Sequence, residues 1–95
     1  MPAYLIADIE VTDVGAYEEY RRHVPEMIAA HGGRYLVRGG AAEVLEGSWQ
    51  PRRMVVLEFP SMAKLRAFYD SADYAPLKAL RMGASDSRII AVEGI

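Results

Sequence analysis

Residues 53–59 read RMVVLEF and lie between two prolines, Pro51 and Pro60. Branched apolar residues in a short run bounded by turn-forming residues are typical of a β-strand. Every position from 54 to 57 is apolar, so this predicted strand carries apolar side chains on both faces. An antiparallel strand with one solvated face would alternate with polar residues instead. The stretch therefore predicts a strand in a sheet that is covered on both sides.

Three further segments have the pattern of strands. Residues 3–11 alternate with the period of two that a strand requires. Residues 34–38 predict a short second strand, and the Gly39–Gly40 pair predicts a bulge or bend after it. Residues 88–93 form the last predicted strand, and within it residues 89–92 resemble residues 54–57 in being apolar on both faces.

The first helical region follows the first strand. After the capping residues Thr12 and Asp13, apolar residues recur at spacings of three and four, and the Gly32–Gly33 pair ends the predicted helix. Pro25 removes one backbone hydrogen bond, so we expect a kink or a division into two segments there.

The second helical region is predicted as two helices. Ser61 caps the first, and Asp73 caps a shorter one that Gly83 ends. The order strand, helix, strand, strand, helix, strand is the split βαβ pattern of an α+β, ferredoxin-like fold over a single domain, residues 1–95. Right-handed crossovers place the helices on one face of a four-stranded antiparallel sheet.

The opposite face of this sheet would be bare in a monomer. Four strands of five or six residues offer roughly 350 Å² of sheet face, at about 3.3 Å per residue and 4.8 Å per strand. That area matches the largest apolar patch of a typical monomer. A second copy of the sheet is the simplest cover, because two-fold homodimers are the commonest oligomers. We therefore expect a homodimer.

Composition excludes several classes of function. The net charge is −2 and no helix carries a cluster of Lys and Arg, so nucleic acid is not an expected partner. The chain has no cysteine, which excludes disulfides and thiolate metal sites. Asp8 and Glu10 interrupt the first apolar run, so we expect no membrane span and a cytoplasmic protein.

The order of short motifs along the chain resembles a known family. These motifs are Val11-Thr12-Asp13, Tyr17 with Tyr20, His31-Gly32-Gly33-Arg34, Arg38-Gly39-Gly40, Glu46-Gly47 with Trp49, Pro51 and Arg53, Glu58-Phe59-Pro60-Ser61, Ser71 with Tyr74, and Arg81. Together they resemble the bacterial family called domain of unknown function thirteen-thirty, over essentially the whole chain. The resemblance implies a dimeric α/β barrel, in which two ferredoxin-like sheets pack face to face. That superfamily includes cofactor-free monooxygenases and muconolactone isomerases, but this family has no assigned reaction.

His31 is the first candidate for chemistry. At about 100° per residue it falls within the apolar stripe of the first helix, so it points inward if the helix is continuous. It could act as a general acid or base, or it could be a core histidine favoured by the dipole at the helix C-terminus. His23 and His31 are roughly 12 Å apart along a straight helix and on different faces, so they cannot share a metal ion.

Arg38, Arg53 and Arg81 lie within the family-like motifs and could hold a carboxylate ligand. Ion pairs with Glu46 or Glu58 are the alternative.

Aromatic residues supply the remaining candidates. Trp49, in the predicted loop 47–52, could cover a pocket or anchor the dimer interface. Tyr17 and Tyr74 could point hydroxyls into a cleft or pack in the core with their hydroxyls satisfied.

Two hypotheses follow. In the first, the chain is a cofactor-independent enzyme or binder for a small organic or aromatic acid. His31 or Glu46 moves a proton, the three arginines hold the anionic group, and Trp49, Tyr17 and Tyr74 pack on the ligand. In the second, the same residues form a hydrogen-bond network in a non-catalytic structural or regulatory homodimer. The first needs a water-accessible cavity lined by His31 and an arginine, and the second needs those groups paired with protein.

Overall fold

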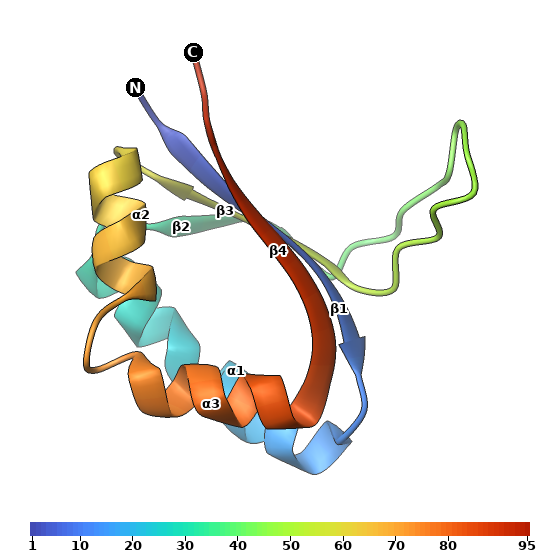
Figure 1. Cartoon of the computed structure of the whole chain (residues 1–95), viewed down its shortest axis with the longest axis horizontal. Coiled ribbons are helices and arrows are strands. Elements are labelled where there is room, and N and C mark those ends of the chain that lie inside the picture. Colours follow the sequence, from blue (N-terminus) through green and yellow to red (C-terminus); the bar gives the residue numbers. More distant parts are fainter.

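The strands form one antiparallel sheet in the order β2-β3-β1-β4. The computed structural model describes all 95 residues. Its elements are β1 (Ala3–Val11), α1 (Val14–Ala30), β2 (Arg34–Arg38), β3 (Met54–Phe59), α2 (Met62–Tyr69), α3 (Ala75–Ala84) and β4 (Ser85–Glu93). This is the ferredoxin-like fold that the sequence predicts, with β1 and β3 at the centre of the sheet (Figure 1).

All three helices lie on one side of the sheet, and the core is between them and that side. Burial alternates along β1 and β3, because every second side chain of each strand points toward the helices. Leu57 and Phe59 of β3 meet Ile28 of α1 and Phe68 of α2 in this layer. None of the helices combines the length and the apolar character that crossing a membrane requires.

Of the kink or division that the sequence predicted at Pro25, the division does not occur. α1 is a single helix of 17 residues with Pro25 inside it. Proline removes only one hydrogen bond of the helix, and Tyr20, Val24 and Ile28 on either side of it remain buried against the sheet. Asp13 caps this helix as predicted, accepting a hydrogen bond from the N–H of Ala16 at 3.1 Å.

The boundaries of α3 and β4 also differ from the prediction. Asp73 does not cap α3; instead the Ser71 hydroxyl accepts a hydrogen bond from the N–H of Tyr74 at 3.1 Å. Gly83 does not end the helix, because its φ is not positive and α3 continues to Ala84. β4 begins directly afterwards at Ser85, three residues earlier than expected, since this end pairs with β1 up to Val11.

The outer face of the sheet is uncovered. Val56, Ile6 and Ile90 are neighbours across β3, β1 and β4, and they form an apolar row on this face. Ile90 is 61% exposed. The segment between β2 and β3, residues 39–53, has no helix or strand and extends away from the body of the molecule (Figure 1). It carries further exposed apolar side chains, including Leu45 and Trp49.

Candidate functional site

A small cavity lies between the sheet and the helices. The centres of water molecules can occupy about 40 Å³ of it, and one water needs about 10–15 Å³ by that measure, so about three would fit. Of its 18 lining residues, 14 are hydrophobic and the other four are arginines: Arg21, Arg38, Arg53 and Arg81. No aspartate, glutamate or histidine lines it. This cavity therefore combines an apolar wall with an excess of positive charge.

Three of these arginines have no carboxylate partner. Arg21 pairs with Glu18 at 3.5 Å, but Arg38, Arg53 and Arg81 take part in no ion pair. The ion pairs to Glu46 or Glu58 that the sequence left open do not form, because Glu58 pairs with Arg34 at 2.8 Å instead. The cavity is thus lined by three guanidinium groups that no carboxylate of the protein neutralises; Arg38 is exposed to solvent, Arg53 is half-buried and Arg81 is buried.

Arg81 is the most buried of the three. It is 4% exposed, and its Nε has no hydrogen-bond partner. Burial lowers the pKa of Arg81 while the neighbouring Tyr74 hydroxyl raises it, and the net shift is upward, so the side chain remains charged. Arg81 reaches the cavity because it lies seven residues, about two helical turns, beyond Tyr74 on the same face of α3. A buried cation without a carboxylate partner is costly unless an anion joins it.

Arg53 is held just before the start of β3 by its contact with Gly39. Gly39 has a φ of +71° and donates its N–H to the carbonyl of Met54 at 2.7 Å. The Arg53 guanidinium lies directly against Gly39, where any Cβ would collide with it. This guanidinium also lies near the Tyr17 ring, with 5.9 Å between its Cζ and the ring centroid. Its Nε, like that of Arg81, has no partner.

A bulge in β2 brings Arg38 and Tyr35 to the same side. Tyr35 pairs with Leu57 and Arg38 with Val55, both on the helix-covered face, because Leu36 is an extra residue in the pairing. Without the bulge, positions 35 and 38 would point to opposite faces. The Arg38 Cζ then lies 4.6 Å from the centroid of the Tyr35 ring. The bulge is thus at Leu36, whereas the Gly39–Gly40 pair supplies the bend that the sequence predicted as the alternative, with Gly39 at a φ of +71°.

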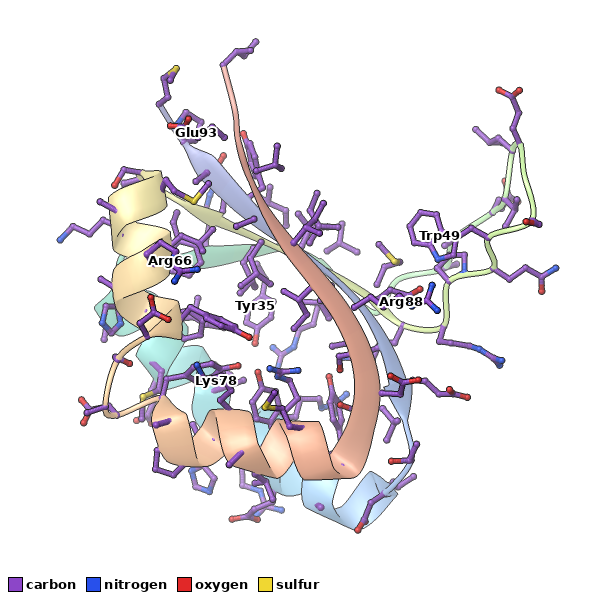
Figure 2. The ribbon with its side chains drawn as sticks, in the orientation of Figure 1. Tyr35, Trp49, Arg66, Lys78, Arg88 and Glu93 are labelled. Carbon is purple, nitrogen blue, oxygen red and sulfur yellow. The ribbon has the colours of Figure 1, made fainter.

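Tyrosines supply the hydrogen-bonding groups of the cavity. The hydroxyls of Tyr20 and Tyr74 lie 2.8 Å apart in a buried hydrogen bond. Burial raises the pKa of Tyr20 well above its ordinary value, and burial also raises the pKa of Tyr35. Both hydroxyls are therefore protonated at neutral pH and can donate to an anion. Figure 2 shows Tyr35 in the space between the helices and the sheet.

His31 lies outside this cavity. It follows α1 directly as the C-capping residue, and its Nδ1 lies 3.0 Å from the carbonyl oxygen of Met27. Its ring packs edge-on against Phe68, with 5.9 Å between the ring centroids. His31 is not among the lining residues, so a proton-transfer role for it stays a prediction that the cavity geometry does not support.

Glu46 and Trp49 lie on the protruding segment, away from the cavity. Both are exposed, and the Trp49 indole N–H donates to the Asp8 carboxylate at 2.8 Å. The N–H of Arg52 donates to the same carboxylate, and these two hydrogen bonds hold the pKa of Asp8 below its ordinary value. Figure 2 shows Trp49 and Arg88 at this end of the molecule. Trp49 therefore borders a polar groove on the outer face and does not cover the cavity.

The lining of the cavity is suited to binding negative charge. Its polar groups are guanidinium groups and tyrosine hydroxyls, both of which can donate hydrogen bonds to an anion. No group of three or more histidine, aspartate or glutamate side chains is placed to hold a metal ion. The arrangement suits an anion with an apolar body.

The sequence model of the family described as Domain of unknown function (DUF1330) matches residues 2–95. The chain belongs to the DUF1330 family. Solved structures with a similar fold include a protein of unknown function from Rhodopseudomonas palustris, with a TM-score of 0.81 and 20% sequence identity. The match covers 99% of the DUF1330 chain and 82% of the Rhodopseudomonas palustris protein. No curated protein sequence matches significantly.

Two further solved structures share the fold at lower identity. A cofactor-independent oxygenase from Streptomyces nogalater, SnoaB, has a TM-score of 0.68 and 10% identity over 99% of the DUF1330 chain and 93% of its own. A dimeric ferredoxin-like protein of unknown function from Jannaschia sp. CCS1 has a TM-score of 0.66 and 12% identity. The match covers 99% of the DUF1330 chain and 100% of the Jannaschia protein. At these identities the similarity establishes the fold alone.

Some of the residues selected from the sequence meet in the cavity, and other lining residues were missed. Arg38, Arg53 and Arg81 share the cavity with both Tyr17 and Tyr74. The missed lining residues with polar groups are Tyr20, Tyr35, Tyr69 and Arg21. Tyr20 had a usable signal, since it lies one helical turn from Tyr17 on the buried stripe. Tyr35 had no such signal in the sequence, because it shares a face with Arg38 only through the bulge.

Proposed function

We propose that this DUF1330 chain binds a small organic acid in the cavity between its sheet and its helices. The observation that carries the proposal is the set of three arginines, Arg38, Arg53 and Arg81, that line the cavity without any carboxylate partner. A purely structural network would pair these groups with protein, yet the Nε atoms of Arg53 and Arg81 are buried and unpaired.

The ligand's chemistry follows from the lining. Guanidinium groups match the geometry of a carboxylate and bind it through charge-assisted hydrogen bonds. The Tyr20 and Tyr35 hydroxyls can donate further hydrogen bonds, and the apolar wall suits a hydrocarbon or aromatic body. A cofactor-independent oxygenase shares this fold, which supports a small-molecule site on it without assigning a reaction.

The test is binding of benzoate against benzamide, its uncharged counterpart of similar shape. We expect benzoate to raise the melting temperature and benzamide to leave it unchanged, because ligand binding to the native state stabilises it. Arg53→Met and Arg81→Met should each abolish the benzoate shift. Arg22→Met is the matched control, since Arg22 is exposed, pairs with Glu19 and lies outside the cavity. Equal shifts for both probes, or an equal loss in the control, would overturn the proposal.

We further propose that the chain acts as a homodimer in which a second copy covers the outer face of the sheet. The apolar row of Val56, Ile6 and Ile90 on this face supports it, together with the exposure of Ile90. A structural neighbour is described as a dimeric ferredoxin-like protein. The cavity lies on the opposite side of the sheet, so this contact leaves it free. The cytoplasmic location stays a prediction from the sequence.

A further inference from the structure

Tyr69 separates the cavity from two grooves on the surface. It is the last residue of α2 and is half-buried. Tyr69 and Ile89 line the cavity, a groove of about 350 Å³ beside α3 and the start of β4, and a groove of about 130 Å³ between α2 and β4. These two side chains are the only ones common to all three spaces, so they form the wall between the cavity and these two grooves.

Of these two residues, Tyr69 is the one that can move. Ile89 belongs to β4 and is fixed by pairing with Ala7 of β1. Tyr69 ends its helix, and residues 70–74 connect it to α3 outside any helix or strand. A terminal helical position beside such a connection changes its backbone and side-chain angles more easily than a strand position does.

Lys78 holds Tyr69 in its observed position. The Lys78 ammonium lies 4.2 Å from the centroid of the Tyr69 ring and also donates a hydrogen bond to the Tyr69 carbonyl at 3.0 Å. Figure 2 shows Lys78 near the connection between α2 and α3. Rotation of the Lys78 side chain can release both of these contacts. The Tyr69 ring also packs beside the Tyr74 ring, with 6.0 Å between the ring centroids, and it would slide past that ring as it moves.

The larger groove leads directly to the anion site. Arg81 lines both this groove and the cavity, together with Tyr69. With Tyr69 in its observed position, the cavity has room for about three water molecules, which is less than an aromatic acid needs. Moving the Tyr69 ring aside would join the cavity to the groove and provide that room.

We propose that the Tyr69 side chain is a gate: when it moves aside, a small organic acid can reach Arg81 from the larger groove. Lys78 holds Tyr69 in the closed position. The identity of the ligand rests on the proposed function above, whereas the gate itself rests on the position of Tyr69.

Thiol labelling tests the gate without a known ligand. The chain has no cysteine, so Ala7→Cys introduces one reporter thiol at a buried position that lines the cavity. Its labelling rate is measured with two methanethiosulfonates of similar size, one carrying a sulfonate and one a trimethylammonium group. We expect Tyr69→Ala to speed labelling by about tenfold or more, and Lys78→Met by about threefold. Tyr69→Phe retains the ring and should leave the rate unchanged.

A control variant that weakens the fold at another place separates gating from general unfolding. Asp13→Ala removes the cap at the start of α1 and leaves α2 and Tyr69 unchanged. If Asp13→Ala speeds labelling as much as Tyr69→Ala does, the reagent enters by unfolding and the gate proposal is wrong. It is also wrong if Tyr69→Ala leaves the rate unchanged. Val24→Cys, on the cavity wall formed by α1, serves as the reporter if Ala7→Cys does not fold.

The same rates distinguish the gate from the anion site. A positively charged cavity should favour the sulfonate reagent, and Arg81→Met should remove that preference. A Tyr69 effect without charge preference would retain the gate and contradict the proposed function. A charge preference without a Tyr69 effect would retain the anion site and contradict the gate.

Discussion

The hydroxyl oxygens of Tyr20 and Tyr74 lie 2.8 Å apart in a buried hydrogen bond between residues that are 54 positions apart in the sequence. Tyr20 comes from the middle of α1 and Tyr74 from the N-terminal cap of α3. This bond therefore fixes where α3 begins relative to α1. Because Arg81 lies about two turns further along α3, the same bond positions the most buried guanidinium of the cavity.

Tyr20→Phe should change the response of stability to high pH. Burial raises the folded-state pKa of Tyr20 above the unfolded value. Above about pH 10 the unfolded chain releases this proton while the folded chain retains it, so stability falls as pH rises, by about 1.4 kcal/mol per pH unit for one such proton. Urea unfolding between pH 7 and about pH 11 should show a shallower decline in Tyr20→Phe, which also loses about 1 kcal/mol at neutral pH. An unchanged slope would contradict this reading of Tyr20.

Arg81→Met should stabilise the protein while it abolishes binding. The buried Nε of Arg81 has no partner, and a buried unsatisfied polar group costs about 1–3 kcal/mol. Methionine fills similar space without that cost, so we expect an increase of about 1 kcal/mol, or roughly 4–8 °C in melting temperature. Calorimetry of the ligand-free protein measures this increase in melting temperature. A marked loss of stability would instead favour the structural-module hypothesis.

His31→Ala separates a structural from a chemical role for this histidine. Its ring packs on Phe68, and its Nδ1 lies within hydrogen-bond distance of the Met27 carbonyl. We expect a loss of about 1 kcal/mol in stability and an unchanged affinity for benzoate by titration calorimetry. A large loss of affinity with little loss of stability would show that His31 takes part in binding after all.

Protonation of Asp8 should release Trp49. Hydrogen bonds from the Arg52 N–H and the Trp49 indole lower the folded-state pKa of Asp8. The stabilisation is present above the unfolded value of about 3.9 and is lost as pH falls through the lower folded-state value. Trp49 is the only tryptophan, so its fluorescence emission should shift to the red as pH falls through this lowered folded-state value, that is, at a pH below about 3.9. Asp8→Ala should show the red-shifted emission at all pH values; a retained acid transition would assign it to another group.

Ile90→Lys should disrupt the proposed homodimer. Ile90 is in the apolar row on the outer face and is 61% exposed in the single chain. Two-fold symmetry would introduce the new charge twice into one interface, so we expect the dissociation constant to increase by roughly 100-fold or more. Sedimentation velocity measures this change. Val14→Lys is the control, because Val14 is similarly exposed but lies at the start of α1. Dimers that persist in Ile90→Lys would place the interface elsewhere.

The order of the secondary-structure elements could be predicted because it depends on local periodicity. Alternation along residues 3–11 and the stripe of Tyr17, Val24 and Ile28 identify a strand and a helix without knowledge of their neighbours. Boundaries were less accurate, since β4 extends to Ser85 only through its pairing with β1. That pairing depends on a segment that lies far away in the chain.

The sequence by itself determined a ferredoxin-like sheet with one bare face, and it marked Arg38, Arg53 and Arg81 as residues to examine. Only the tertiary structure decided that these three arginines meet without a carboxylate, and that His31, Glu46 and Trp49 lie elsewhere. The clearest case is the pair Tyr35 and Arg38, three positions apart, which a regular strand would place on opposite faces. Their shared face depends on one extra residue in the hydrogen-bond register between β2 and β3, and the register of two strands is a property of both strands together.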